Sequence, residues 1–164
     1  MNKKAVKKWA FYAGFGLLAM LLQEHLLSGL KIRGVHPMLG GVLTAVIAMF
    51  EGGMGGAGFG LYIGILQDAS IKGAEGYFPV IYLLGGVATG LICEYMFRKS
   101  LFTAFLWSLL ITTITTLFYF LLFFMITGRA GISALWLTAL PEIIYSALML
   151  PFIYYPARHI ANIK

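Results

Sequence analysis

The fold is decided by residues 51–86, EGGMGGAGFGLYIGILQDASIKGAEGYFPVIYLLGG. Within this stretch, small or acidic residues recur at every fourth position: Gly52, Gly56, Gly60, Gly64 and Asp68. In a helix such residues lie along one face, which here is bare backbone ending in a carboxylate. Small residues at this spacing let two helices in a membrane approach closely. The pattern therefore predicts a tight helix contact, either with another helix of the same chain or with a helix of a partner protein.

The candidate partner-contact residues are Gly56, Gly60, Gly64 and Asp68. A carboxylate in hydrocarbon costs about 2.5 kcal/mol or more unless it is paired, so Asp68 is a natural contact point for a partner. The alternative is an ion pair at the membrane surface, because Lys72 follows Asp68 by four residues in the favourable order. The residues alone leave both interpretations open.

The composition is that of an integral membrane protein. Of 164 residues, 60% are hydrophobic and 11% are charged, and the mean hydropathy is +0.89. Soluble domains carry about 25% charged residues. The net charge of +6 comes from basic residues scattered at the ends of apolar runs, which is not the pattern of a nucleic-acid interface. We expect one membrane domain over residues 1–164.

Apolar runs predict an all-α polytopic bundle of about six spans, some of them short or broken by glycine, since each span takes about 20 residues. The runs are residues 9–30, 37–50, 57–71, 77–97, 101–127 and 131–155. The second run gives about 21 Å of helix, which is short for a hydrocarbon core of about 30 Å. Either the bilayer is thin there or the following glycine-rich turn lies within the membrane.

A break in the helix is expected near the adjacent glycines of residues 51–56, because one helix over residues 37–71 would be about 52 Å long. Glu51, just before them, is expected to lie in water. With both termini in the cytoplasm, eight of the twelve lysines and arginines are inside, as the positive-inside rule prefers. The outer four are Lys31, Arg33, Lys72 and Arg129.

Two further acids, Glu24 and Glu142, are candidate buried polar groups. Glu24 lies in the outer half of the first run, so it faces either the bundle interior or a water-exposed helix end. Glu142 follows Pro141. It lies near the bilayer centre if the last span is continuous, and is a first-turn acid if Pro141 begins a shorter helix, which is the interpretation we prefer.

Motifs of known catalytic chemistry are absent from the sequence. It contains no P-loop, G-x-S-x-G, H-E-x-x-H or C-x-x-C pattern, and its one cysteine and three widely spaced histidines predict no metal cluster. We therefore expect no catalytic residue, cofactor or metal, and expect the protein not to be an enzyme.

The stretch GFGLYIGILQDASIKGAEGYFPVIYLLGGVATG, residues 58–90, resembles the central signature of the rod shape-determining protein MreD family. The signature is Gly-x-x-x-Gly-x-x-x-Asp, a short loop, then a glycine and an aromatic residue that open the next span. The ending LPEIIYSALMLPFIYYPARHI, residues 140–160, is similar to the last span of that family. The size and span number also fit. One departure is Tyr145 and Ser146, where many relatives have an asparagine.

The resemblance implies a non-catalytic protein of the bacterial cytoplasmic membrane that belongs to the cell-elongation (rod) complex. Such a protein scaffolds the synthesis of side-wall peptidoglycan. Its implied partners are the bitopic protein MreC, with MreB, RodA and a class B penicillin-binding transpeptidase in the wider complex, and no small-molecule substrate.

The runner-up is the substrate-binding (S) subunit of an energy-coupling-factor vitamin transporter, which has a similar size, span number and glycine-rich third region. That function needs an outward-facing polar pocket. Its candidate lining is Glu24, His25, Asp68 and Glu142.

Overall fold

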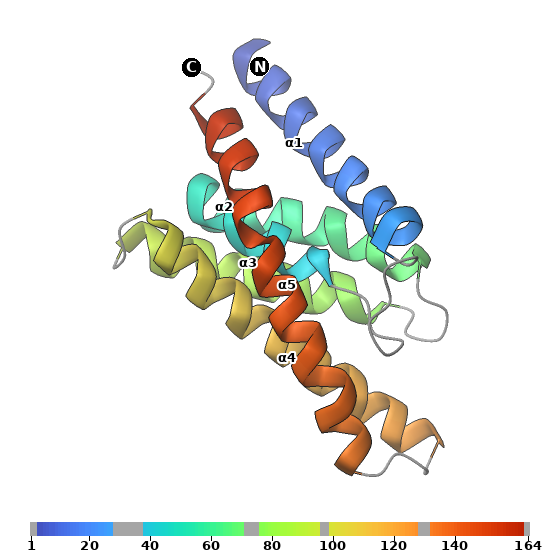
Figure 1. Ribbon diagram of the computed structural model, residues 1–164. Coiled ribbons are helices and arrows are strands. Elements are labelled where there is room, and N and C mark those ends of the chain that lie inside the picture. The colour runs from blue at the N-terminus through green and yellow to red at the C-terminus, as the bar shows by residue number, and fades with distance from the viewer. Residues whose placement is uncertain (1–2, 28–37, 71–75, 96–98, 128–131, 163–164) are drawn as a thin grey trace.

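The computed structural model describes residues 3–27, 38–70, 76–95, 99–127 and 132–162, and these residues form helices only (Figure 1). The helices are α1 (Lys3–Leu22), the π-helical turn η1 (Gln23–Leu27), α2 (Leu39–Ser70), α3 (Tyr77–Tyr95), α4 (Leu101–Thr127) and α5 (Ile132–Ala161). Over these ranges, three helices are long and apolar enough to cross a membrane: α2, α3 and α4. The all-helical class is confirmed. The helix count in the described part is five α-helices, so the count of six is not confirmed.

Helix α2 is broken at Gly52, whose φ of 78° and ψ of −174° lie outside the helical region. Glycine adopts a positive φ without the steric penalty that a Cβ brings. Beyond the break the chain turns back on itself. Gly56 lies against Ala48 and Gly60 against Thr44, so residues 39–51 and residues 53–70 form two antiparallel halves. The break that length and glycine content predicted is confirmed.

The first half of α2 is the centre of the molecule (Figure 1). Every residue from Met38 to Met49 is buried. This segment is apolar all round apart from Thr44, as is usual for a helix enclosed on every side. Side chains of η1 and α5 accept hydrogen bonds from the backbone N–H groups at its start. Leu39 N–H donates to Gln23 Oε1 at 2.7 Å, and Met38 N–H donates to Ser146 Oγ at 2.9 Å.

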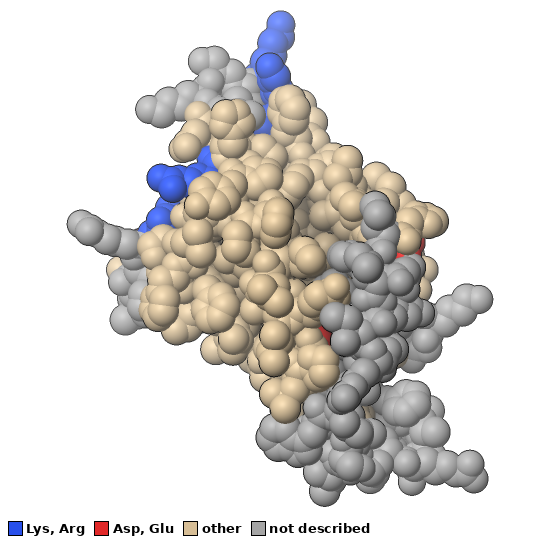
Figure 2. All heavy atoms as spheres, viewed as in Figure 1, with Lys and Arg blue, Asp and Glu red and all other residues tan. Residues whose placement is uncertain are grey.

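Glu51, at the break, does not lie in water as expected. Its side chain is 11% exposed, forms an ion pair with Lys8 Nζ at 2.7 Å, and accepts a hydrogen bond from Tyr12 OH at 2.9 Å. The expectation was wrong because the turn at Gly52 places Glu51 against the basic start of α1. On the same end, Lys99 Nζ donates to Phe50 O at 2.7 Å. Figure 2 shows the basic side chains at one edge of a broad uncharged surface.

Hydroxyl groups of α4 face the inside of the bundle. Ser108 and Thr115 are buried, and each donates a hydrogen bond to a carbonyl of its own helix, Phe105 O and Ile111 O. Such bonds satisfy the hydroxyl groups locally. The outward side of α4 carries exposed leucine, isoleucine and phenylalanine, which suits contact with lipid.

Candidate functional site

The glycine face of α2 packs directly on α3 of the same chain. A Cβ atom added at Gly60 would lie 2.2 Å from Tyr82 O, and one at Gly56 would lie 2.4 Å from Gly86 O. At Gly64 the nearest atom would be Pro79 Cα at 2.4 Å. Each of these contacts is with backbone. The sequence left open whether the facing helix belongs to this chain, and the contacts identify it as α3.

The contact is reciprocal, because α3 carries glycines at matching positions. A Cβ at Gly86 would lie 2.2 Å from Gly56 O, and one at Gly90 would lie 2.4 Å from Gly52 O. Two helices with bare backbone on both sides pack closely enough for dispersion forces to hold them. The glycines are therefore covered by the partner helix of the same chain, whereas Leu61 and Ile65 are exposed on the outer surface of the pair.

Asp68, near the end of α2, contacts the residue just before α3. Its Oδ2 accepts a hydrogen bond from the N–H of Gly76, which has a φ of 84° and directly precedes the first residue of α3. A carboxylate at the start of a helix is favoured by the helix dipole. Lys72, the alternative partner of Asp68, lies outside the described residues.

We predict that Asp68→Ala lowers the free energy of unfolding by about 1 to 2 kcal/mol, because both the acceptor and the charge are lost. Asp68→Asn keeps an acceptor oxygen and is expected to cost about 1 kcal/mol or less. Thermal unfolding of the purified variants measures both values. Lys72→Gln is the control: if it matches Asp68→Asn, the surface ion pair and not the Gly76 contact is the source of the effect.

The other two acids differ in their surroundings. Glu24 is exposed on η1, which fits the water-exposed alternative. Glu142 is partly buried in the middle of α5, which is a continuous helix through Pro141. The preferred interpretation, a first-turn acid, is therefore wrong, because Pro141 lies inside the helix and does not begin it.

Buried polar side chains gather where α2 begins. Gln67 and Tyr82 are fully buried and both reach Gly40, where an added Cβ would lie 3.0 Å from Gln67 Oε1 and 2.8 Å from Tyr82 OH. Gln23 Nε2 donates to Gln67 Oε1 at 3.4 Å. Five buried atoms of this region have no hydrogen-bond partner: Gln67 Nε2, Tyr82 OH, and the hydroxyl oxygens of Thr44, Thr112 and Thr116.

Glu142 lies beside this polar cluster. The Thr116 hydroxyl lies near the Glu142 carboxyl group but does not form a hydrogen bond of ordinary geometry with it. Tyr82 is close enough for an electrostatic interaction with the Glu142 carboxyl group. Buried polar groups in proteins are nearly always paired with protein or with ordered water. The cluster thus offers donors and acceptors to water or to a small polar solute. Among the described residues, no three His, Cys, Asp or Glu side chains are grouped to hold a metal.

Sequence reasoning missed Gln67 and Tyr82. The only local signal was a glutamine inside an apolar run, next to the more conspicuous Asp68. Of the predicted pocket lining, the structure places Glu142 beside the cluster and leaves Glu24 on the surface.

No protein-family model, curated protein or solved structure matches the chain. The likeness to the MreD family therefore rests on the residues quoted above, and the function follows as a proposal.

Proposed function

We propose that the protein is a non-catalytic component of the bacterial cell-elongation (rod) complex, of the MreD type, which scaffolds peptidoglycan synthesis through helix contacts with MreC. The observation that carries the proposal is the signature over residues 58–90. Its glycines make close backbone contacts between α2 and α3, and its aspartate accepts a hydrogen bond from Gly76, directly before α3. The residues that carry the resemblance are thus the ones that hold α2 and α3 together.

The proposed topology has six passes through the bacterial cytoplasmic membrane, with both termini in the cytoplasm. The two halves of α2 count as separate passes. The ion pair of Lys8 with Glu51 and the bond of Lys99 to Phe50 O bring the start of α1, the break in α2 and the start of α4 to one end, as six passes require. Labelling of single cysteines after Cys93→Ser tests this: Arg98→Cys should react from the cytoplasm and Arg129→Cys from outside.

A scaffold of this type binds partners through surface shape. The α2 and α3 pair is held by backbone contacts and leaves Leu61, Ile65 and Leu84 exposed on its surface. A single-span partner such as MreC would pack on exposed apolar side chains of this kind by dispersion contacts, since lipid supplies little hydrophobic force.

The test is affinity purification of the tagged chain from native membranes after mild crosslinking. We expect MreC to be recovered well above the level obtained with an unrelated tagged protein of the same membrane. Loss of the chain from a rod-shaped cell should give round cells that regain rod shape when the gene is restored. Recovery of MreC at the background level, with rod shape unaffected by the loss, would contradict the proposal.

The second candidate, a vitamin-transporter S subunit, is favoured by one observation, the buried polar cluster with its unpaired Gln67 and Tyr82 atoms. A ligand that binds the folded state at 100 times its Kd adds about 2.7 kcal/mol to the free energy of unfolding. Thermal unfolding with a panel of vitamins tests this function. Stabilisation by one vitamin that disappears in Gln67→Leu would favour the transporter over the scaffold.

A further inference from the structure

Exposed cations of α1 and α5 lie at the end of the molecule that holds both the N and C ends of the chain (Figure 1). Lys3 and Lys7 are exposed in the first turns of α1, and Arg158 is exposed in the last turns of α5. The two helices contact each other. In Figure 2, basic side chains project at this edge of the uncharged surface. One pair of neighbouring helices thus carries three positive charges at one end.

The three cations have no acidic partner among the described residues. The sequence contains no aspartate or glutamate in residues 1–22 or in residues 147–164. Glu51, which reaches α1 from the break in α2, is already paired with Lys8. The charge at this end is therefore available to an anion from outside the chain.

Exposed aromatic rings lie next to the cations on the same helix faces. On α1, Phe11 follows Lys7 by four residues, and Lys7 Nζ lies over the exposed Phe11 ring at 6.0 Å from its centre. On α5, Phe152, Tyr155 and Arg158 are spaced by three residues and are all exposed. Residues at these spacings share a helix face. Toward this end of the molecule, each face therefore changes from exposed rings to a cation.

The spacing between rings and cations matches the layers of a membrane surface. Phe11 and Lys7 are separated by about 6 Å along the helix axis, and Tyr155 and Arg158 by about 4.5 Å. The headgroup layer is about 5 to 8 Å thick on each side of the hydrocarbon core. With the Tyr155 ring at the edge of the hydrocarbon, where tyrosine is enriched, the cations reach the level of the lipid phosphates.

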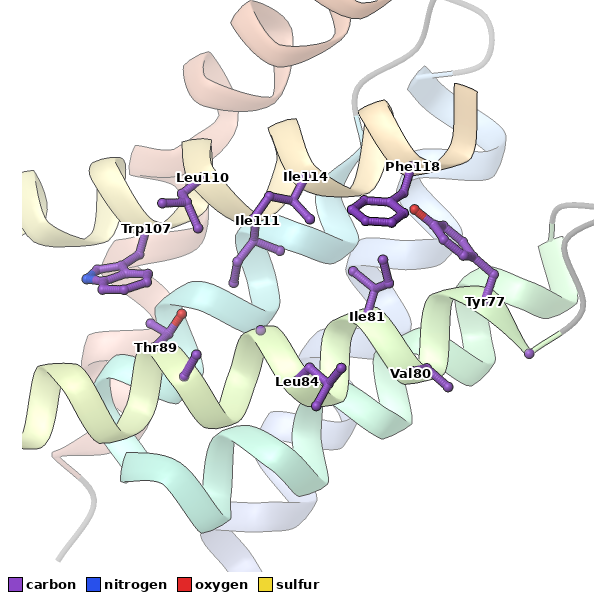
Figure 3. A pocket seen from close by; sticks show the side chains of 13 residues that line it. Tyr77, Val80, Ile81, Leu84, Thr89, Trp107, Leu110, Ile111, Ile114 and Phe118 are labelled. Carbon is purple, nitrogen blue, oxygen red and sulfur yellow. The ribbon is translucent and has the colours of Figure 1, made fainter. Parts of the chain in front are cut away.

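The apolar surfaces of the molecule do not distinguish one lipid headgroup from another. The groove between α3 and α4, for example, is lined by apolar side chains that include Val80, Leu84 and Ile114 (Figure 3). Acyl chains are common to phospholipids of every headgroup, so such walls do not select among them. Selection requires charge, and a lysine or arginine near the membrane surface attracts anionic lipid.

The occupant that fits these faces is an amphiphile with a negative group at one end. An acidic segment of a protein would meet the cations and leave the exposed rings uncovered, whereas a phospholipid covers both. We propose that this end of α1 and α5 binds anionic phospholipid, with phosphate groups at Lys3, Lys7 and Arg158 and acyl chains against Phe11 and Phe152. The proposal needs only a bilayer around the helices, so it is independent of the proposed function.

The test is native mass spectrometry of the full chain in detergent with added phosphatidylglycerol or phosphatidylcholine of equal acyl chains. Wild type should retain phosphatidylglycerol in preference to phosphatidylcholine by about tenfold or more. The triple variant Lys3→Gln, Lys7→Gln, Arg158→Gln should lose most of this preference and retain phosphatidylcholine as wild type does. All three side chains are exposed, so thermal unfolding in phosphatidylcholine should be unchanged.

Single variants separate a local site from a general effect of net charge. Lys7→Gln should lower the preference about fivefold, and Lys7→Arg should keep it. Lys72→Gln removes the same charge between Asp68 and Glu75 in the sequence and should leave the preference unchanged. Equal retention of both lipids by wild type, or equal effects of Lys7→Gln and Lys72→Gln, would overturn the proposal. So would a photo-crosslinker at position 11 that joins a polypeptide in native membranes in place of phospholipid.

Discussion

Gly60→Leu is expected to prevent the protein from accumulating in the membrane. The new Cβ alone would lie 2.2 Å from Tyr82 O, and no side-chain rotation relieves a clash with backbone. Enlarging a side chain in a packed core usually costs about 1 to 3 kcal/mol. Here two helix backbones must separate along their whole contact, so we expect a cost above about 3 kcal/mol. Immunoblots of membrane fractions and thermal unfolding of any purified protein measure the effect.

The control is Gly58→Leu. Gly58 lies two residues away on the same helix half, and an added Cβ there meets no atom within 4 Å. Both changes remove a glycine from a helix, so only the contact differs. Normal abundance of Gly60→Leu beside Gly58→Leu would show that α3 does not press on this face. If the Gly60→Leu protein kept normal abundance but no longer recovered MreC, the glycine face of α2 would instead be the surface that contacts the partner.

Lys8→Met is expected to lower the free energy of unfolding by about 2 kcal/mol. The Lys8 and Glu51 side chains are 23% and 11% exposed and lie 2.7 Å apart, so the pair is largely shielded from water. Removing one partner of a fully buried pair costs about 3 to 5 kcal/mol because the other charge stays uncompensated. Partial exposure and the hydrogen bond from Tyr12 reduce that figure. Chemical or thermal unfolding in detergent provides the measurement.

A double-mutant cycle separates the pair from its surroundings. Glu51→Gln removes the charge and keeps the size, and the double variant with Lys8→Met should be more stable than Lys8→Met alone. We expect a coupling free energy above about 1 kcal/mol. Additive effects, within about 0.5 kcal/mol, would mean that the two charges do not interact in the folded protein.

Much of the fold could be predicted because its signals are local. The four-residue spacing of glycine predicted a close helix contact, since spacing alone fixes which residues share a helix face. The break at Gly52 followed from length, because a straight helix over residues 37–71 is too long for a bilayer. The limits of α4 also matched, since its apolar run ends at clear polar residues.

The remainder depends on which residues meet in space. Glu51 looked like a turn residue in water because nothing in the sequence indicates that Lys8 and Tyr12 lie beside it. Pro141 looked like a helix start, yet α5 continues through it. Gln67 and Tyr82 carry no motif, and only the packing of Gly40 against both brings them together. Contacts over long sequence separations leave no periodic trace in a single sequence.

The enclosed position of residues 39–51 has a consequence for biogenesis. As the ribosome delivers the chain to the membrane, each pass enters lipid when its own transfer is favourable. This segment is only about 20 Å long, and the surfaces that cover it include Tyr82, Thr112 and Ser146, all of which are synthesised later. We therefore expect it to enter together with residues 53–70 as a hairpin and to reach its final packing only after α5 has been made. On this expectation, the middle of the molecule reaches its final packing last.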